Sequence, residues 1–272
     1  MALNPLAQRI LTAAALVAVL LPAFLLLPKA FGLVLIGLFV LGAAWEWSGF
    51  LGFGSVLPRL ACVALVALLL AASRLLMPAV LPVTVIAACA MLWWALAFLL
   101  ILRFPVPIRR PVAALCGLLV LLPAWACLAA LLYTDVDGRA LLLLALAIVW
   151  AADVGAYFAG RRLGRVRLAP QVSPGKTWEG VLGGLACATV TAVAGAAILG
   201  HPPGPAAALG LSVGAISIVG DLTVSMFKRN AGLKDSGNLF PGHGGILDRI
   251  DSVTAAAPLF LLEAGWLGWL GA

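Results

Sequence analysis

The sequence predicts an all-α fold, a polytopic integral membrane bundle of about nine transmembrane helices. Hydrophobic residues occupy 64% of its 272 positions, and only 10% of the residues are charged. The mean hydropathy of +1.17 is far above that of soluble proteins. Several apolar runs are also long enough to cross a bilayer as helices. Together these features exclude a soluble globular domain.

Nine apolar runs, separated by charged or glycine- and proline-containing segments, are the candidate spans. The first begins just after Arg9 and lacks a small-residue cleavage site after it, so we interpret it as a retained helix and not a signal peptide. In chain order the predicted spans are 10–28, 30–47, 60–76, 79–102, 111–133, 139–160, 178–199, 206–227 and 253–271.

The basic residues predict the orientation of the bundle. If Arg9 lies inside, 14 of the 17 lysines and arginines share its side, and only Lys29, Arg74 and Arg139 lie on the other. The positive-inside rule assigns the basic side to the cytoplasm. We therefore expect a multi-pass protein of the cell inner (plasma) membrane with its polar site on the cytoplasmic side. Binding of anionic lipid alone would explain the net charge of +7, but not the acids among the bases.

The stretch from Ser225 to Ser252 concentrates charges of both signs. Its charged residues are Lys228, Arg229, Lys234, Asp235, Asp248, Arg249 and Asp251. Glycines precede a helix start predicted near Ile246, and free amides ahead of a helix N-terminus favour an anion. Asp248 and Asp251 are three residues apart, so they share a helix face and can share a cation. We predict a phosphate bound through a divalent metal.

Four further acids lie near the inner ends of four different spans: Glu46, Asp153, Glu179 and Asp221. A charged side chain in the membrane costs about 2.5–3.5 kcal/mol on insertion scales, so these acids require partners or a wet cavity. Asp221 and Ser225 share one helix face, and Lys228 follows one turn later. We expect this face to point toward the glycine-rich loop.

The segment from Ser173 to Gly180 (SPGKTWEG) places Ser173, Lys176 and Thr177 directly before a predicted helix N-terminus. The lysine supplies a positive charge and the following amides a dipole, as in a phosphate-binding loop. The GxxxxGK[ST] spacing of such loops is absent.

Simpler structural roles compete for two of the acids, Asp153 and Glu46, and none is evident for a third, Glu263. Asp153 could pair with Arg161 or Arg162. Glu46 lies between two tryptophans, which favours an interfacial anchor. Glu263 lies within the last predicted span and has no partner nearby in the sequence.

The pattern S-x-x-K-R-x4-K-D-x-G-x3-P-G-H-G-G-x-x-D-R-x-D, from Ser225 to Asp251, resembles the signature of phosphatidate cytidylyltransferases, also called CDP-diacylglycerol synthases. The segments 153–160, 173–180 and 220–222 are similar to other blocks of that family. The resemblance is specific over about residues 150–252. One departure is Gly175, where a second lysine often stands in the family, which leaves the number of lysines on the triphosphate open.

The resemblance implies transfer of a cytidylyl group from CTP to phosphatidic acid, which yields CDP-diacylglycerol and pyrophosphate and requires Mg²⁺. It also implies a homodimer and a monovalent cation such as K⁺ beside the Mg²⁺. Membrane lipids are expected partners, and nucleic acid is not. The chain then divides into N-terminal membrane helices, 1–110, and a membrane-embedded catalytic region, 111–272, with cytoplasmic loops 161–177 and 228–251.

The expected site combines metal ligands, phosphate ligands and one histidine. Asp221 and Asp248 are the expected Mg²⁺ ligands, with Asp251 as a further or indirect ligand. His243 is expected to orient a phosphate or relay a proton. The expected phosphate ligands are Lys176, Lys228, Arg229, Lys234 and Arg249, with hydrogen bonds from Ser173, Thr177 and Ser225.

Two other classes of protein remain open at this point. One is another CTP-dependent lipid phosphotransferase, such as a polyprenol kinase-like protein, which would transfer the γ-phosphoryl group and leave CDP. The other is an anion transporter, which would place its charges and helix breaks near the bilayer midplane. The charges of this chain gather near one face instead, which disfavours the transporter.

Overall fold

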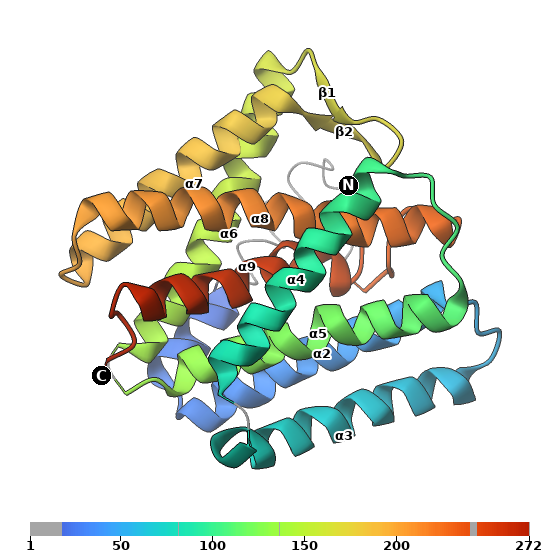
Figure 1. Ribbon diagram of the computed structural model, residues 1–272, viewed down its shortest axis with the longest axis horizontal. Coiled ribbons are helices and arrows are strands. Elements are labelled where there is room, and N and C mark those ends of the chain that lie inside the picture. Colours follow the sequence, from blue (N-terminus) through green and yellow to red (C-terminus); the bar gives the residue numbers. More distant parts are fainter. Residues whose placement is uncertain (1–17, 81, 136, 240–243, 272) are drawn as a thin grey trace, which may run out of the picture.

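The computed structural model describes residues 18–80, 82–135, 137–239 and 244–271, and it confirms a helical membrane bundle (Figure 1). Within these residues, seven helices are long and apolar enough to cross a membrane. They are α2 (Lys29–Phe50), α3 (Val56–Val80), α4 (Val83–Leu102), α5 (Arg110–Tyr133), α6 (Gly138–Leu163), α7 (Trp178–Ile198) and α8 (Pro203–Asn230).

The first and last predicted spans differ from these seven. Residues 18–26 are helical, but the start of the predicted span 10–28 lies outside the described residues. The last helix is α9 (Leu247–Trp266), which begins six residues before the predicted span 253–271. Its first two turns carry Asp248, Arg249 and Asp251, so hydropathy alone could not locate its start.

A short antiparallel hairpin departs from the all-α expectation. Strands β1 (Arg167–Ala169) and β2 (Ser173–Thr177) pair within the predicted loop 161–177, with Arg167 opposite Thr177. Helix α7 starts directly after β2, because the Thr177 hydroxyl accepts the Gly180 N–H at 3.2 Å and caps the helix. The hairpin thus holds Lys176 just before a helix N-terminus, as predicted.

Helices α6 and α7 pack closely along one side of the bundle (Figure 1). Small residues permit this approach: a methyl group at Gly155 would overlap Cys187 and the Gly183 carbonyl, and one at Gly184 would press on the Ala152 carbonyl. Helix α9 lies at the centre of the bundle, where it contacts α2, α4, α5, α6 and α8. The candidate site lies where α9 begins, and residues of α6, α8 and the hairpin complete its lining.

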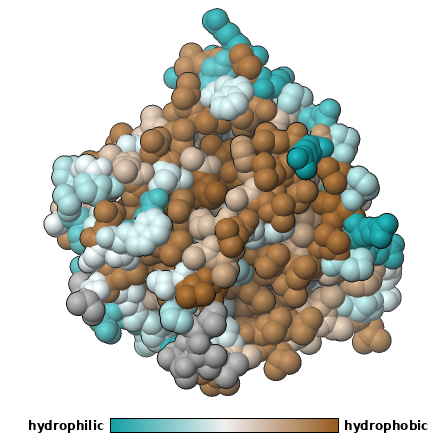
Figure 2. Space-filling model, in the orientation of Figure 1, coloured by the Kyte–Doolittle hydropathy of each residue, from teal (hydrophilic) through white to brown (hydrophobic). Residues whose placement is uncertain are grey.

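The three basic residues predicted on the outer side gather at one end of the bundle. The Lys29 ammonium donates to the Thr134 carbonyl at 3.1 Å, and the Arg139 guanidinium donates to the Leu25 carbonyl at 2.6 Å. The Arg74 guanidinium lies 4.6 Å from the centre of the Tyr133 ring. Figure 2 shows apolar side chains over the middle of the visible face and hydrophilic ones at its top and right edges. The hairpin and the C-terminal end of α8 lie at those edges in Figure 1.

Candidate active site

Asp248, in the first turn of α9, is held by three donors. The Lys228 ammonium, near the C-terminus of α8, lies 2.6 Å from its Oδ1 atom. The backbone N–H groups of Ser236 and Gly245 donate to Oδ2 at 2.9 and 3.0 Å. The two charged side chains are only 10% and 8% exposed. This ion pair is therefore buried, and its carboxylate has a fixed direction.

A second ion pair joins the hairpin to α8. The Lys176 ammonium lies 2.6 Å from Asp221 Oδ2, and each side chain is 27% exposed. The Ser225 hydroxyl donates to Asp221 Oδ1 at 3.2 Å, which confirms that these two residues share a helix face. Because this pair is more exposed than the first, it can open at lower cost.

Both ion pairs border one polar cavity of about 560 Å³. This volume falls in the range of small-molecule sites. Its charged and hydroxyl lining includes Asp153, Lys176, Thr177, Asp221, Asp248, Arg249 and Asp251. The cavity thus joins carboxylates from α6, α8 and α9 with basic groups from β2 and α9. It can accept a polyanion together with a cation.

Four other predicted ligands are not placed in the cavity lining by the structure. Ser173 pairs with Ala169 in the hairpin and is not among the cavity residues. Arg229 donates to the Val172 carbonyl at 3.2 Å, which ties α8 to the hairpin, and Lys234 is exposed outside the cavity. His243 lies outside the described residues. The roles of these four residues in phosphate binding stay predictions.

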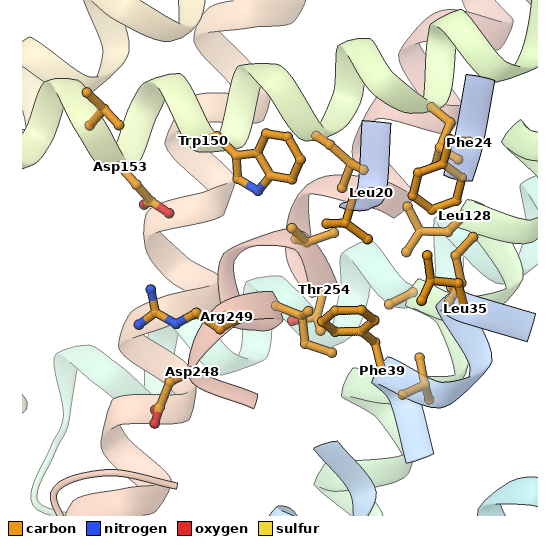
Figure 3. Close-up of a pocket in the computed structure, with 18 residues that line it drawn as sticks. Leu20, Phe24, Leu35, Phe39, Leu128, Trp150, Asp153, Asp248, Arg249 and Thr254 are labelled. Carbon is orange, nitrogen blue, oxygen red and sulfur yellow. The ribbon is translucent and has the colours of Figure 1, made fainter. Parts of the chain in front are cut away.

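An apolar cavity of about 330 Å³ adjoins the polar one (Figure 3). Asp153, Asp248 and Arg249 line both cavities. The remaining walls are mostly aliphatic and aromatic, and include Leu20, Phe24, Leu35, Phe39, Leu128 and Trp150. Figure 3 shows the three charged side chains at one end of this space and the apolar ones at the other. Sequence patterns did not indicate this cavity, because its lining comes from helices far apart in the chain.

Glu46 is not the interfacial anchor that its tryptophan neighbours suggested. Its side chain is 8% exposed and reaches from α2 to the start of α9. There it accepts the N–H groups of Ile246 and Leu247, both at 2.8 Å, and the Ser236 hydroxyl at 2.6 Å. Leu247 is 201 residues away in the chain, so no local pattern could reveal the contact.

The structure also defines the surroundings of two other acids, Asp153 and Glu263. Within the described residues, Asp153 forms no ion pair with Arg161 or Arg162, and Arg161 instead donates to the Tyr157 hydroxyl at 2.8 Å. Asp153 lines the two cavities. Glu263 has a partner after all: the Ser212 hydroxyl of α8 donates to it at 2.7 Å.

The donors around the polar cavity fit a magnesium ion that is held together with a substrate. Asp221 and Asp248 present carboxylate oxygens from two helices to the same space. No three acids, histidines or cysteines of the described residues are grouped closely enough to hold a metal by themselves. Mg²⁺ commonly binds one or two carboxylates and completes its shell with water and substrate phosphates. Asp251 also lines the cavity, and its Oδ1 accepts the Ser252 N–H at 2.8 Å.

Comparison with known proteins gives independent evidence on the family of this chain. The model of the cytidylyltransferase family matches residues 7–264. A phosphatidate cytidylyltransferase of Pseudomonas aeruginosa is 45% identical over 285 aligned residues, which cover 96% of this chain and 98% of that protein. The enzyme of the same name from Haemophilus influenzae is 38% identical, with 94% and 97% covered. A third, from Synechocystis, is 52% identical over 124 residues, which are 45% of this chain and 42% of that protein.

Proposed function

Because the chain belongs to the cytidylyltransferase family, we propose that it transfers CMP from CTP to phosphatidic acid, giving CDP-diacylglycerol and pyrophosphate in phospholipid biosynthesis. The observation that carries this proposal is the junction of a charged cavity with an apolar one at Asp153, Asp248 and Arg249. A nucleotide is a polyanion and phosphatidate is an anion on two acyl chains. A junction of the two kinds of cavity suits an enzyme that joins such a pair.

The polar cavity supplies the groups that would hold the triphosphate. Lys176 and Arg249 line it, and Lys228 borders it through Asp248. Incoming phosphates would draw the lysines from their carboxylates, which frees Asp221 and Asp248 to hold Mg²⁺. The ion, when bound, neutralises charge on the triphosphate and on the leaving pyrophosphate. The protein then contributes mainly position and electrostatic stabilisation.

The proposed reaction is a single displacement at the α-phosphorus of CTP. A phosphate oxygen of phosphatidate forms a new P–O bond there, while the bond from the α-phosphorus to the α,β-bridging oxygen breaks. Pyrophosphate leaves with that bonding pair. The lipid phosphate is already ionised at neutral pH, so the step requires no strong base. Arg249, which lines both cavities, is placed to hold the two anions near each other.

The apolar cavity suits an acyl chain of the lipid substrate. Its charged end faces the proposed reaction site, and its apolar end lies between α2, α5 and α6 (Figure 3). A phosphatidate headgroup at Arg249 would leave its glycerol and one chain directed into this space. Burial of methylene groups there stabilises the complex by about 0.8 kcal/mol each.

We also place the active site at the cytoplasmic face of the inner membrane. The supporting observation is that Lys29, Arg74 and Arg139 gather at the end of the bundle away from the polar cavity. A homodimer, and K⁺ beside the Mg²⁺, remain part of the proposal on the strength of the family resemblance alone.

The decisive experiment follows the label of the nucleotide. Membranes that contain the protein are incubated with phosphatidate, Mg²⁺ and CTP labelled at the α- or the γ-phosphate. We expect the α-label in a chloroform-soluble nucleotide lipid and the γ-label in pyrophosphate. Transfer of the γ-label to lipid would establish a kinase instead. Transport of an anion without any labelled lipid would point to a carrier.

Narrowing the apolar cavity should weaken binding of the lipid but not of CTP. Leu35→Trp adds bulk to the cavity wall on α2, and we expect the KM for long-chain phosphatidate to rise about three- to tenfold. Leu38→Trp is the matched control, since Leu38 lies on the same helix, is 58% exposed and is not among the lining residues. Steady-state kinetics in mixed micelles give the KM for phosphatidate and the KM for CTP. An unchanged lipid KM in Leu35→Trp would contradict the acyl-chain assignment.

A further inference from the structure

Glu46 is a buried carboxylate whose charge is not balanced by a basic side chain within the described residues. Its three hydrogen bonds come instead from Ser236, Ile246 and Leu247. A buried ionised group is costly unless hydrogen bonds or charges compensate it. Here the compensation is the N-terminus of α9, whose unpaired amides and dipole favour a negative charge.

The chain around Glu46 is shaped to admit its carboxylate. A methyl group added at Gly237 or at Gly245 would overlap the Glu46 carboxylate, so a side chain at either position would push it away from the amides. Helix caps normally come from the residue just before the helix. In this protein Ile246 holds that place and offers no side-chain cap, and α2 supplies the carboxylate from across the bundle.

The same contacts connect Glu46 with Asp248. The Ser236 hydroxyl donates to Glu46, while the Ser236 N–H donates to Asp248 Oδ2 at 2.9 Å. Leu247, whose N–H Glu46 accepts, directly precedes Asp248. Gly245, which packs against Glu46, also donates to Asp248, at 3.0 Å. Of the two backbone amides that hold Asp248, one therefore belongs to Ser236, a partner of Glu46, and the other to Gly245, which directly precedes the partner Ile246.

We propose that Glu46 is a positioning residue for the reaction: it caps α9 from α2, holds Ser236 and residues 245–247 in place, and so aims the Asp248 carboxylate into the polar cavity. The role in turnover rests on the proposed function, but the capping does not. Glu46 does not itself line the polar cavity, so its effect must pass through Asp248. Nothing in the local sequence of α2 requires an acid at this depth.

Glu46→Gln tests the proposal, because a carboxamide has one acceptor oxygen and turns an N–H₂ group toward backbone donors. We expect kcat to fall by about 10- to 100-fold and the Mg²⁺ concentration for half-maximal rate to rise about tenfold, as for groups that orient a metal ligand. In the ligand-free protein, amide hydrogen exchange should accelerate at Ser236, Ile246 and Leu247, but not along the rest of α9. If Glu46 had a purely structural role, the variant would unfold at a lower temperature, but the protein that remains folded would show an unchanged Mg²⁺ dependence of turnover.

Two further variants sharpen this test. Ser236→Ala removes only the hydroxyl link, and a loss of about three- to tenfold in kcat is expected; it also serves as the test if Glu46→Gln does not fold. Glu263→Gln is the control, an acid at the far end of α9 that accepts one serine hydroxyl, and should behave as the unaltered protein. Unaltered turnover and Mg²⁺ dependence in Glu46→Gln would overturn the proposal. An unaltered protein that makes no CDP-diacylglycerol would refute the proposed function, while the exchange data would still decide the capping.

Discussion

Replacing Asp221 or Asp248 by asparagine is expected to reduce kcat for CDP-diacylglycerol synthesis by at least about a thousandfold. Each side chain presents a carboxylate to the polar cavity from a different helix. Each is paired with a lysine that is expected to hold a phosphate once substrate binds. Asparagine keeps the shape but removes the charge that a divalent ion requires. The measurement is the rate of labelled CDP-diacylglycerol formation at saturating CTP, phosphatidate and Mg²⁺.

The two substitutions should differ in their effect on stability. Asp248 is 8% exposed and accepts two backbone amides besides Lys228, whereas Asp221 is 27% exposed. We therefore expect a larger fall of the unfolding temperature in detergent for Asp248→Asn. Asp135→Asn changes an exposed acid near the C-terminus of α5 and should leave both activity and stability unaltered. Full activity of either cavity variant would remove its carboxylate from the metal site.

Hydropathy and helical periodicity predicted the parts of this structure that depend on neighbours in the chain. The spans follow from apolar length, and the shared face of Asp221 and Ser225 follows from their spacing of four residues. The start of α7 at Trp178 follows from the capping hydroxyl of Thr177. Each is decided within one or two helical turns.

The partners of the charged residues could not be predicted in the same way. Lys176 meets Asp221, and Lys228 meets Asp248, only because the hairpin, α8 and α9 pack at one place. Glu46 depends on an approach between α2 and α9 that no hydropathy profile encodes. The hairpin was missed because its strands are short and the second contains Pro174 and Gly175, which are unfavourable in strands.

The buried pair of Lys228 and Asp248 gives the second large expected effect. Lys228→Met removes the ammonium and leaves the Asp248 charge in a site that is almost closed to water. Breaking a buried ion pair in this way typically costs about 3–5 kcal/mol, so the unfolding temperature in detergent should fall clearly. Turnover should fall as well, by about 100-fold or more, because the same ammonium is expected to hold a phosphate in the transition state.

Lys176→Met separates the two effects, since its pair with Asp221 is about three times as exposed on both side chains and water can replace the ammonium. We expect it to lose turnover to a similar extent with a smaller loss of stability. The double variant Lys228→Met/Asp248→Asn should be more stable than Lys228→Met alone, because a neutral amide no longer needs the countercharge, and it should remain inactive. Equal destabilisation by the two lysine variants, or no recovery in the double variant, would mean that the buried charge pair does not hold α8 against the start of α9.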